Sequence, residues 1–185
     1  MSEKKNLTTK ETSILALQHL KKNNLQAAEQ LYKQILKIEP NHLESIFNLG
    51  SLSVQTENFD TAKQLLNKTI EIDPNHAKAH NNLGIVFQET GETQKAISCY
   101  EKAIQINPHY AQAHNNLANI LQELGELQKA KNCYEKLLNL DPTYKKGYSG
   151  YGNLLLKITQ HSKGLAYIRK GTGVIRFTKK DVKII

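Results

Sequence analysis

Apolar residues recur along this chain at helical spacing, in short segments that are separated by polar breaks. At about 100° per residue, one side of the segment that begins at Ala77 gathers residues suited to packing: His80, Leu83, Gly84 and Phe87. The opposite side of the same segment is mostly polar: Lys78, Asn82, Ile85 and Glu89. Because this arrangement returns in segment after segment, the pattern predicts a series of amphipathic α-helices.

The chain also repeats itself. Residues 77–110 and 111–144 are identical at 19 of 34 aligned positions, whereas chance matching gives about two. The prolines follow the same 34-residue period: Pro40, Pro74, Pro108 and Pro142. Such a period predicts supersecondary units that stack on their neighbours, so that the core is a line of contacts between adjacent units.

Further positions keep this period. An alanine lies 12 positions before each proline, and a Tyr or Leu follows it four positions later, as at Ala96 and Tyr100. One shared position holds Leu83-Gly84 in one repeat and Leu117-Ala118 in the next. These features resemble the tetratricopeptide repeat family, whose pattern is Trp-x-x-Leu-Gly-x-x-Tyr, then Ala-x-x-x-Phe, then Pro. The chain has no Trp, and the Trp position holds Thr12, Ile46, His80, His114 and Tyr148.

The resemblance covers about residues 9–170 and implies an all-α fold, a right-handed superhelical solenoid of four full repeats and a partial fifth. The repeat boundaries are predicted at about residues 9–42, 43–76, 77–110, 111–144 and 145–170. Turns between the paired helices are expected at these positions: Asn23-Asn24, Glu57-Asn58, Gly91 and Gly125. Glycine suits them because it adopts the left-handed conformation at little cost. The polar residues 1–8 are expected to fray.

The C-terminal part departs from the pattern. We expect a shortened last helix from about Ser162 to Lys170, ended by Gly171. Residues 171–185 are then predicted to form a short strand-like or irregular basic tail, because Val174–Thr178 is rich in β-branched residues. This tail is a candidate for the start of a further domain.

Charge is divided unevenly between these parts. Residues 11–144 carry 12 Lys against 15 Asp or Glu, whereas residues 145–185 carry 10 Lys or Arg against Asp181 alone. Such a basic end suits nucleic acid or anionic lipid. It contains one aromatic residue, Phe177, and no recognisable binding module. We therefore do not expect nucleic acid as the partner.

Several classes of function are disfavoured. No apolar run reaches the roughly 18 residues of a membrane helix, and no secretion signal is visible at the start. Cys99 and Cys133 are the two cysteines, too few for a disulfide framework, so we interpret the protein as cytoplasmic. His76 and His80 lie four residues apart, but nothing completes a metal site. No nucleophile–base pair or phosphate loop is present, so we expect no metal, no cofactor and no enzyme activity within these residues.

The strongest candidate site is a ladder of asparagines at one repeat position: Asn48, Asn82 and Asn116. Asn costs about half a kcal/mol against Ala inside a helix. A carboxamide offers donors and an acceptor, which match the two groups of an extended peptide backbone. We predict a peptide-binding groove that also includes neighbouring polar residues: Lys78, Asn81, Glu89, Gln112, Asn115, Asn119, Glu123 and Asn153. The plain alternative is a solvated polar face.

The motif His-Asn-Asn-Leu-Gly and the ladder resemble the superhelical repeats of the O-linked N-acetylglucosamine transferase family, which implies that such asparagines hold substrate chains. Our first hypothesis is a non-catalytic scaffold that binds a peptide or protein segment. The alternative is the recruiting module of a larger glycosyltransferase or oxygenase-type hydroxylase, with its chemistry beyond residue 185. A clamp for a C-terminal carboxylate is disfavoured because Lys78 stands alone in the groove. Self-association through the terminal repeats is a further expectation.

Overall fold

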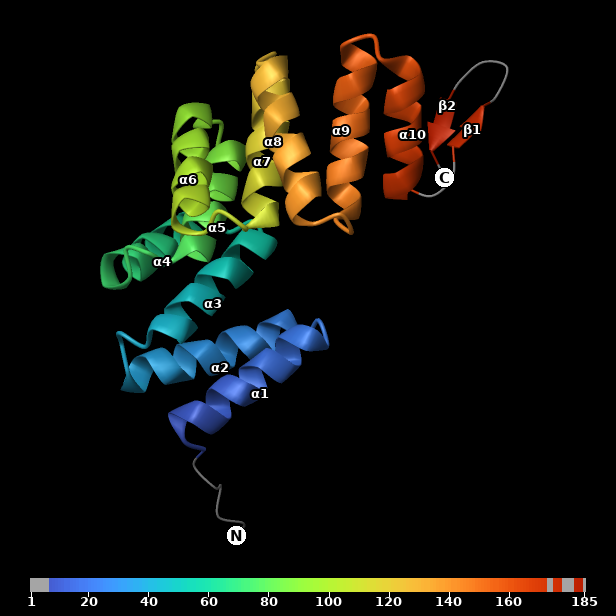
Figure 1. The fold of residues 1–185 in the computed structure, drawn as a ribbon. Coiled ribbons are helices and arrows are strands. Elements are labelled where there is room, and N and C mark those ends of the chain that lie inside the picture. Colours follow the sequence, from blue (N-terminus) through green and yellow to red (C-terminus); the bar gives the residue numbers. More distant parts are fainter. Residues whose placement is uncertain (1–6, 173–174, 178–181, 185) are drawn as a thin grey trace. The chain divides into compact units, whose positions relative to one another are not determined.

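The structure is a computed structural model that describes residues 7–172, 175–177 and 182–184 (Figure 1). Within these residues the chain forms ten helices and a short hairpin. The helices are α1 (Thr9–Lys21), α2 (Leu25–Ile38), α3 (Leu43–Gln55), α4 (Phe59–Ile72), α5 (Ala77–Glu89), α6 (Thr93–Ile106), α7 (Ala111–Glu123), α8 (Leu127–Leu140), α9 (Lys145–Lys157) and α10 (His161–Thr172). The predicted all-α repeat architecture is confirmed.

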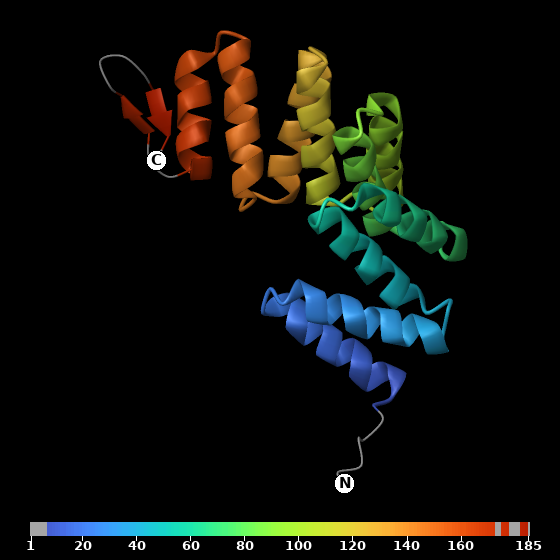
Figure 2. The same ribbon diagram turned by 180° about the vertical axis from the view of Figure 1, so that it is seen from behind.

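The chain divides into two compact units, residues 1–91 and residues 92–185. In the first unit, each helix from α1 to α5 packs on the next one along the chain, and α3 also contacts α5. In the second unit, α6 to α10 pack in the same order, and α7 also contacts α9 (Figures 1 and 2). Contacts between sequence neighbours are what a repeat solenoid requires.

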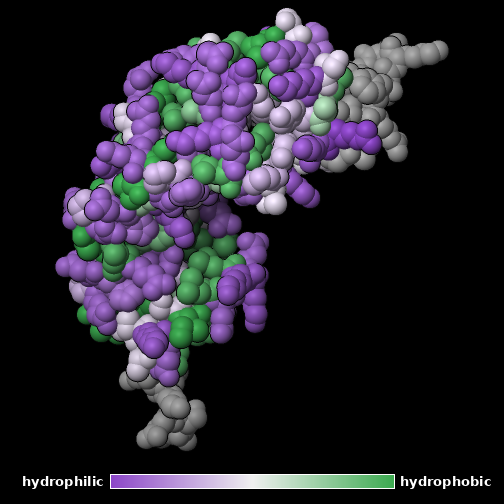
Figure 3. Space-filling view, viewed as in Figure 1, coloured by the Kyte–Doolittle hydropathy of each residue, from purple (hydrophilic) through white to green (hydrophobic). Residues whose placement is uncertain are grey.

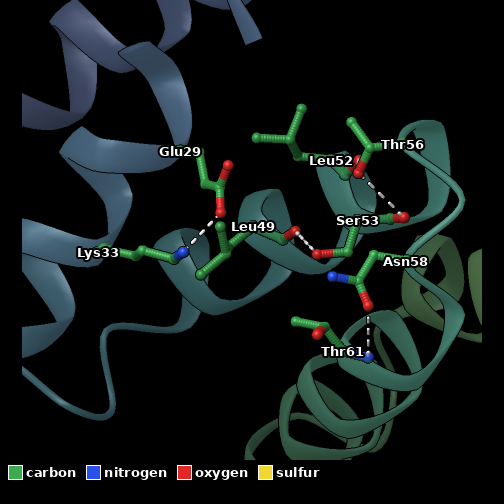
Figure 4. A network of polar contacts seen from close by, with 8 residues as sticks. All are labelled: Glu29, Lys33, Leu49, Leu52, Ser53, Thr56, Asn58 and Thr61. Atoms are coloured by element: carbon green, nitrogen blue, oxygen red, sulfur yellow. Dashed lines mark hydrogen bonds and ion pairs between the residues drawn. The ribbon is translucent and has the colours of Figure 1, made fainter. Parts of the chain in front are cut away.

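Side chains cap the first five helices. Thr8 forms a capping box at the start of α1, so this residue of the segment expected to fray is ordered by the helix. Asn24 and Asn58 cap α2 and α4, and Figure 4 shows the bond from the Thr61 amide to Asn58. His76 caps α5 through Nδ1, which accepts from the Ala79 amide at 3.1 Å. These caps stabilise the starts of α1 to α5, whereas α6 to α9 begin at the equivalent repeat positions without a side-chain cap.

One turn position has a left-handed backbone in every helix pair of the described chain. The predicted turns at Asn23, Glu57, Gly91 and Gly125 are confirmed, with φ of 56°, 58°, 78° and 77°. Thr159 holds the same position in the last pair, with φ of 64°. Glycine adopts this conformation freely, whereas a β-branched residue such as Thr159 is strained there.

The core consists of residues at the predicted packing positions. Ala28, Ala62, Ala96 and Ala130 are fully buried, as are the aromatic residues Tyr32, Tyr100 and Tyr134. Polar residues within α3 satisfy themselves locally: Ser53 Oγ donates to the Leu49 carbonyl at 2.9 Å (Figure 4). The helices can therefore stack closely without leaving these hydroxyls unpaired.

The end of the solenoid differs from the prediction. Helix α10 continues through Gly171 to Thr172 instead of ending at Lys170. A Cβ at Gly171 would lie 2.2 Å from Ser149 Oγ, so this glycine serves close packing against α9 and does not stop the helix. The hairpin follows, with β1 (Ile175–Phe177) antiparallel to β2 (Val182–Ile184). Other parts of the predicted tail, residues 173–174, 178–181 and 185, lie outside the described residues, as do residues 1–6.

Candidate functional site: the polar face of the first helices

The first helix of each repeat presents four positions that we call the polar face. They are Glu44, Asn48, Ser51 and Gln55 on α3, Lys78, Asn82, Ile85 and Glu89 on α5, and Gln112, Asn116, Asn119 and Glu123 on α7. On these three helices the outer two positions are exposed and the middle two are half-buried. On the opposite side Leu49, Leu83 and Leu117 are buried. The division of each helix into two faces therefore matches the observed exposure.

In the first unit the Asn82 carboxamide is held between two helices. Its Nδ2 donates to Ser51 Oγ on α3 at 2.9 Å, and its Oδ1 accepts from Asn81 Nδ2 at 3.3 Å. The Ser51 hydroxyl in turn donates to the Phe47 carbonyl at 2.9 Å. A carboxamide has two N–H donors and two acceptor lone pairs, so the bonds that the described residues form leave one of each on Asn82. The side chain both ties α5 to α3 and keeps capacity for a ligand.

Asn48 lies on α3, the helix that α5 contacts, beside the core residue Tyr32. Burial raises the pKa of Tyr32 to about 12, with the Glu44 carboxylate adding to the rise and the Asn48 carboxamide opposing it. The Tyr32 hydroxyl is buried and forms no hydrogen bond among the described residues. Two residues of the polar face, the exposed Glu44 and the half-buried Asn48, thus lie near the buried hydroxyl of Tyr32.

In the second unit the corresponding tyrosine is satisfied. The Tyr134 hydroxyl donates to Asn119 Oδ1 at 2.5 Å and approaches Gln122 Oε1 at 3.5 Å. Burial raises the pKa of Tyr134, so its hydroxyl stays protonated and remains a donor. Asn116 lies half-buried one turn earlier on the same face of α7. Asn119 is therefore partly engaged in holding α8.

The predicted site residues fall into three environments. Asn81 and Asn115 are buried, at 0% and 6% exposure, so they offer little surface to a ligand. Asn48, Asn82, Asn116 and Asn119 are half-buried on the polar face. Lys78, Glu89, Gln112, Glu123 and Asn153 are exposed. Asn48 and Asn82 belong to the first unit and Asn116 to the second, so the structure brings the first two of the ladder to contacting helices.

Two histidines that occupy the Trp position of the repeat have a role that the sequence analysis missed. His80 Nε2 lies 3.0 Å from the Pro74 carbonyl, and His114 Nε2 lies 2.9 Å from the Pro108 carbonyl. Each neutral imidazole can donate to the turn that precedes its helix. The sequence does contain a signal for this contact, because each of the two histidines follows a proline by six residues. Burial lowers the pKa of His114.

The remaining candidates for chemistry have structural explanations. His76 caps α5 and packs on Phe47, with ring centroids 4.4 Å apart. Cys99 and Cys133 are half-buried free thiols, and burial raises the pKa of each. No group of three metal-ligating side chains lies within the described residues. Among the described helices none combines the length and the apolar character that crossing a bilayer requires.

Comparisons with known proteins agree with this architecture. Two family models, both described as tetratricopeptide repeat, match residues 19–83 and 75–143. No curated protein matches the chain.

Solved structures share the fold along most of the chain. MamA is 26% identical, with 89% of this chain and 90% of that chain covered and a TM-score of 0.71. A thermophilic TPR protein from Thermus thermophilus is 20% identical, with 90% and 91% covered and a TM-score of 0.76. The pilF protein of Pseudomonas aeruginosa is 20% identical, with 89% and 75% covered and a TM-score of 0.80. The narrower resemblance to the O-linked N-acetylglucosamine transferase repeats finds no support in these matches.

Proposed function

Because this chain is built from tetratricopeptide repeats, we propose that it is a non-catalytic interaction module that binds a protein or peptide segment on the polar face. The observation that carries this proposal is the environment of Asn82. Its carboxamide is fixed by Ser51 and Asn81, yet it retains one N–H donor and one acceptor lone pair. A fixed, half-satisfied polar group is prepared to bind because little side-chain entropy remains to be lost.

The chemistry of the proposed contact follows from what a carboxamide can do. An extended peptide presents an N–H and a C=O from each residue other than proline. Asn48 and Asn82 occupy equivalent positions on the contacting helices α3 and α5, so both can meet one backbone. Exposed charges at Glu44, Lys78 and Glu89 surround them and can select among side chains. Binding would then combine backbone recognition with a choice of charge.

A second candidate is the substrate-recruiting module of a larger glycosyltransferase or oxygenase-type hydroxylase. It is favoured by the change from helical repeats to strands after α10, where β1 and β2 pair. Under this alternative the polar face would hold the substrate of a separate catalytic domain. The two candidates share the binding surface, and the sequence of the complete gene distinguishes them: an open reading frame that ends at Ile185 removes the second.

The proposal is tested by selecting binders from a random peptide library displayed on phage and measuring the enriched peptides by isothermal titration. The triple variant Asn48→Ala, Asn82→Ala, Asn116→Ala removes the ladder. Each lost hydrogen bond is worth about 0.5–1.5 kcal/mol, so we expect affinity to fall by roughly tenfold or more.

A matched control removes exposed carboxamides from second helices, with Asn67→Ala on α4 and Asn132→Ala on α8. We expect this control to bind like the wild type. Equal affinities for the ladder variant and the control, with circular dichroism showing both folded, would reject the polar face as the binding surface.

A further inference from the structure

The polar face changes character at the first repeat. Its middle positions, which carry Asn48 and Ser51 on α3, carry Ile14 and Leu17 on α1. Ile14 is 48% exposed although it is a large apolar residue, and Leu17 is half-buried. Both line a hollow of about 440 Å³ together with Thr9, Lys10, Ser13, Glu39, His42 and Glu44. Figure 3 shows hydrophobic surface interleaved with hydrophilic surface over the α1–α3 region.

Charge in this hollow is predominantly negative. Glu39 and Glu44 contribute two exposed carboxylates, against one ammonium from Lys10. Glu39 Oε1 accepts from the Thr9 hydroxyl at 2.6 Å, and His42 Nδ1 is used in capping α3. Among the residues that the structure describes, neither carboxylate forms an ion pair with Lys10 or any other cation. Among the described residues, both carboxylates are therefore without a cationic partner.

A second feature of the first repeat concerns the core residue Tyr32. The Tyr32 hydroxyl is buried without a partner among the described residues, whereas the equivalent Tyr134 hydroxyl donates to Asn119. Asn119 and Leu17 occupy the same repeat position, so Leu17 stands where a partner for Tyr32 would be. The first repeat thus lacks the hydrogen bond that Asn119 forms in the fourth, and it exposes apolar surface next to acidic groups.

We propose that this hollow is a specificity subsite for an apolar side chain flanked by Lys or Arg, within the segment that binds the polar face. The inference rests on the proposed function. The apolar side chain would pack on Ile14 and Leu17, and the cation would meet Glu39 and Glu44. Because Asn48 lies one turn beyond Glu44 on α3, the backbone of the same segment can continue onto Asn48 and Asn82.

The test uses fluorescence anisotropy with three labelled peptides that share Gly and Ser flanks. The first carries a central Leu-Lys-Leu-Lys motif, the second replaces each Leu by Ser, and the third replaces each Lys by Glu. Burying a leucine side chain favours binding enough that the first peptide should bind the wild type about tenfold more tightly than the second. It should also bind about tenfold more tightly than the third, and this second preference should weaken as salt rises.

Variants assign each preference to its residues. Ile14→Ser should remove most of the preference for Leu over Ser, and Glu39→Gln with Glu44→Gln should remove the preference for Lys over Glu. The matched control is Glu57→Gln with Glu71→Gln, which neutralises two exposed carboxylates elsewhere in the first unit and should leave both preferences intact. Asn48→Ala with Asn82→Ala should lower the affinity of all three peptides alike.

Three results would overturn the subsite. Equal binding of the three peptides, with all of them weakened by the asparagine variant, leaves the proposed function standing and removes the subsite. Absence of binding by the Leu-Lys peptide rejects the subsite, while library-selected binders that depend on the ladder still uphold the general function. Self-association of the wild type that the Glu39→Gln, Glu44→Gln variant abolishes would instead assign the hollow to a second copy of this chain.

Discussion

The first and fourth repeats are both helix pairs with a buried tyrosine, but the surface beside that tyrosine is apolar in the first repeat and polar in the fourth. Tyr32 and Tyr134 occupy the same position and are both fully buried. The Tyr134 hydroxyl donates to Asn119, whereas Leu17 takes that position in the first repeat and leaves the Tyr32 hydroxyl unpaired within the described chain. The repeats thus differ together in two properties: whether the core tyrosine is hydrogen-bonded by the first helix, and whether the adjacent surface is polar or apolar.

The two repeats also differ in how tightly the first helix is held. Leu117 on α7 is buried, whereas Leu15 at the equivalent position of α1 is half-buried. His114 binds the preceding proline turn through Nε2, and its counterpart Thr12 donates to the Thr8 carbonyl at 2.9 Å. The first helix of the first repeat is therefore less buried at these positions than that of the fourth.

The largest effect is expected from truncating these leucines. Leu117→Ala should lower the free energy of unfolding by about 2–5 kcal/mol, because it removes a buried side chain and leaves a cavity. Leu15→Ala should cost less than half as much, because part of that side chain is already in solvent. Urea unfolding followed by circular dichroism measures both. Equal costs would show that the two first helices are equally well packed.

An intermediate effect is expected from deleting the two tyrosine hydroxyls. Tyr134→Phe breaks the bond to Asn119 and should cost about 0.5–1.5 kcal/mol. Tyr32→Phe should be neutral or stabilising, since it removes a buried hydroxyl that has no partner among the described residues. Urea unfolding of the two single variants measures the difference. A Tyr32→Phe cost as large as that of Tyr134→Phe would mean that the Tyr32 hydroxyl is paired in solution.

A smaller effect is expected when the first repeat receives the residue of the fourth. Leu17→Asn places a carboxamide where Asn119 lies in the fourth repeat, so it should create a coupling with Tyr32. A double-mutant cycle that combines Leu17→Asn with Tyr32→Phe isolates this term, which should be about 0.5–1.5 kcal/mol. A coupling near zero would show that the two helix pairs differ in more than this one position.

The smallest effect is expected from pH. Burial lowers the pKa of His114 below the ordinary value of 6.5, with Lys136 adding to the decrease and the bond to the Pro108 carbonyl opposing it. The unfolded chain therefore takes up this proton first as pH falls. Stability is complete above about pH 6.5 and is lost as the pH falls through the lower folded pKa.

His114→Thr installs the residue of the first repeat, which does not titrate in this range. The thermal stability of the variant should fall less between about pH 7 and pH 5 than that of the wild type. His76, whose pKa burial also lowers, contributes equally to both proteins. Identical slopes for the two proteins would show that His114 is not buried as a neutral group.

Much of the fold could be predicted from the sequence, because each 34-residue repeat indicates the same two helices and the same turn. The turns at Gly91 and Gly125 and the packing positions at Leu83 and Leu117 were predicted correctly. The end of α10 was not, because Gly171 packs against Ser149 on another helix and a local pattern contains no such contact. Local signals predicted the elements, and contacts between elements adjusted their ends.

The candidate site was predictable only in outline. A helical pattern assigns Asn48 and Asn82 to the outer face, and their half-buried state agrees with it. The predicted groove also included the adjacent residues Asn81 and Asn115, yet both are buried, because they lie outside the polar positions of the helical pattern. The bond from Asn82 to Ser51 spans 31 residues of sequence. The hollow beside α1 likewise needs Glu39 and Glu44 from outside that helix.

By itself the sequence determined the repeat, its helices and turns, and which side of each first helix packs. These properties depend on backbone geometry and on the burial of apolar side chains. Both recur in each repeat because the same residue types recur at the same repeat positions. The tertiary structure alone decided which polar groups are already paired, as at Asn82 and Tyr134, and which remain open within the described residues, as at Glu44 and Tyr32. A hydrogen bond or a hollow requires atoms from separate helices to lie within a few ångströms, and only packing sets those distances.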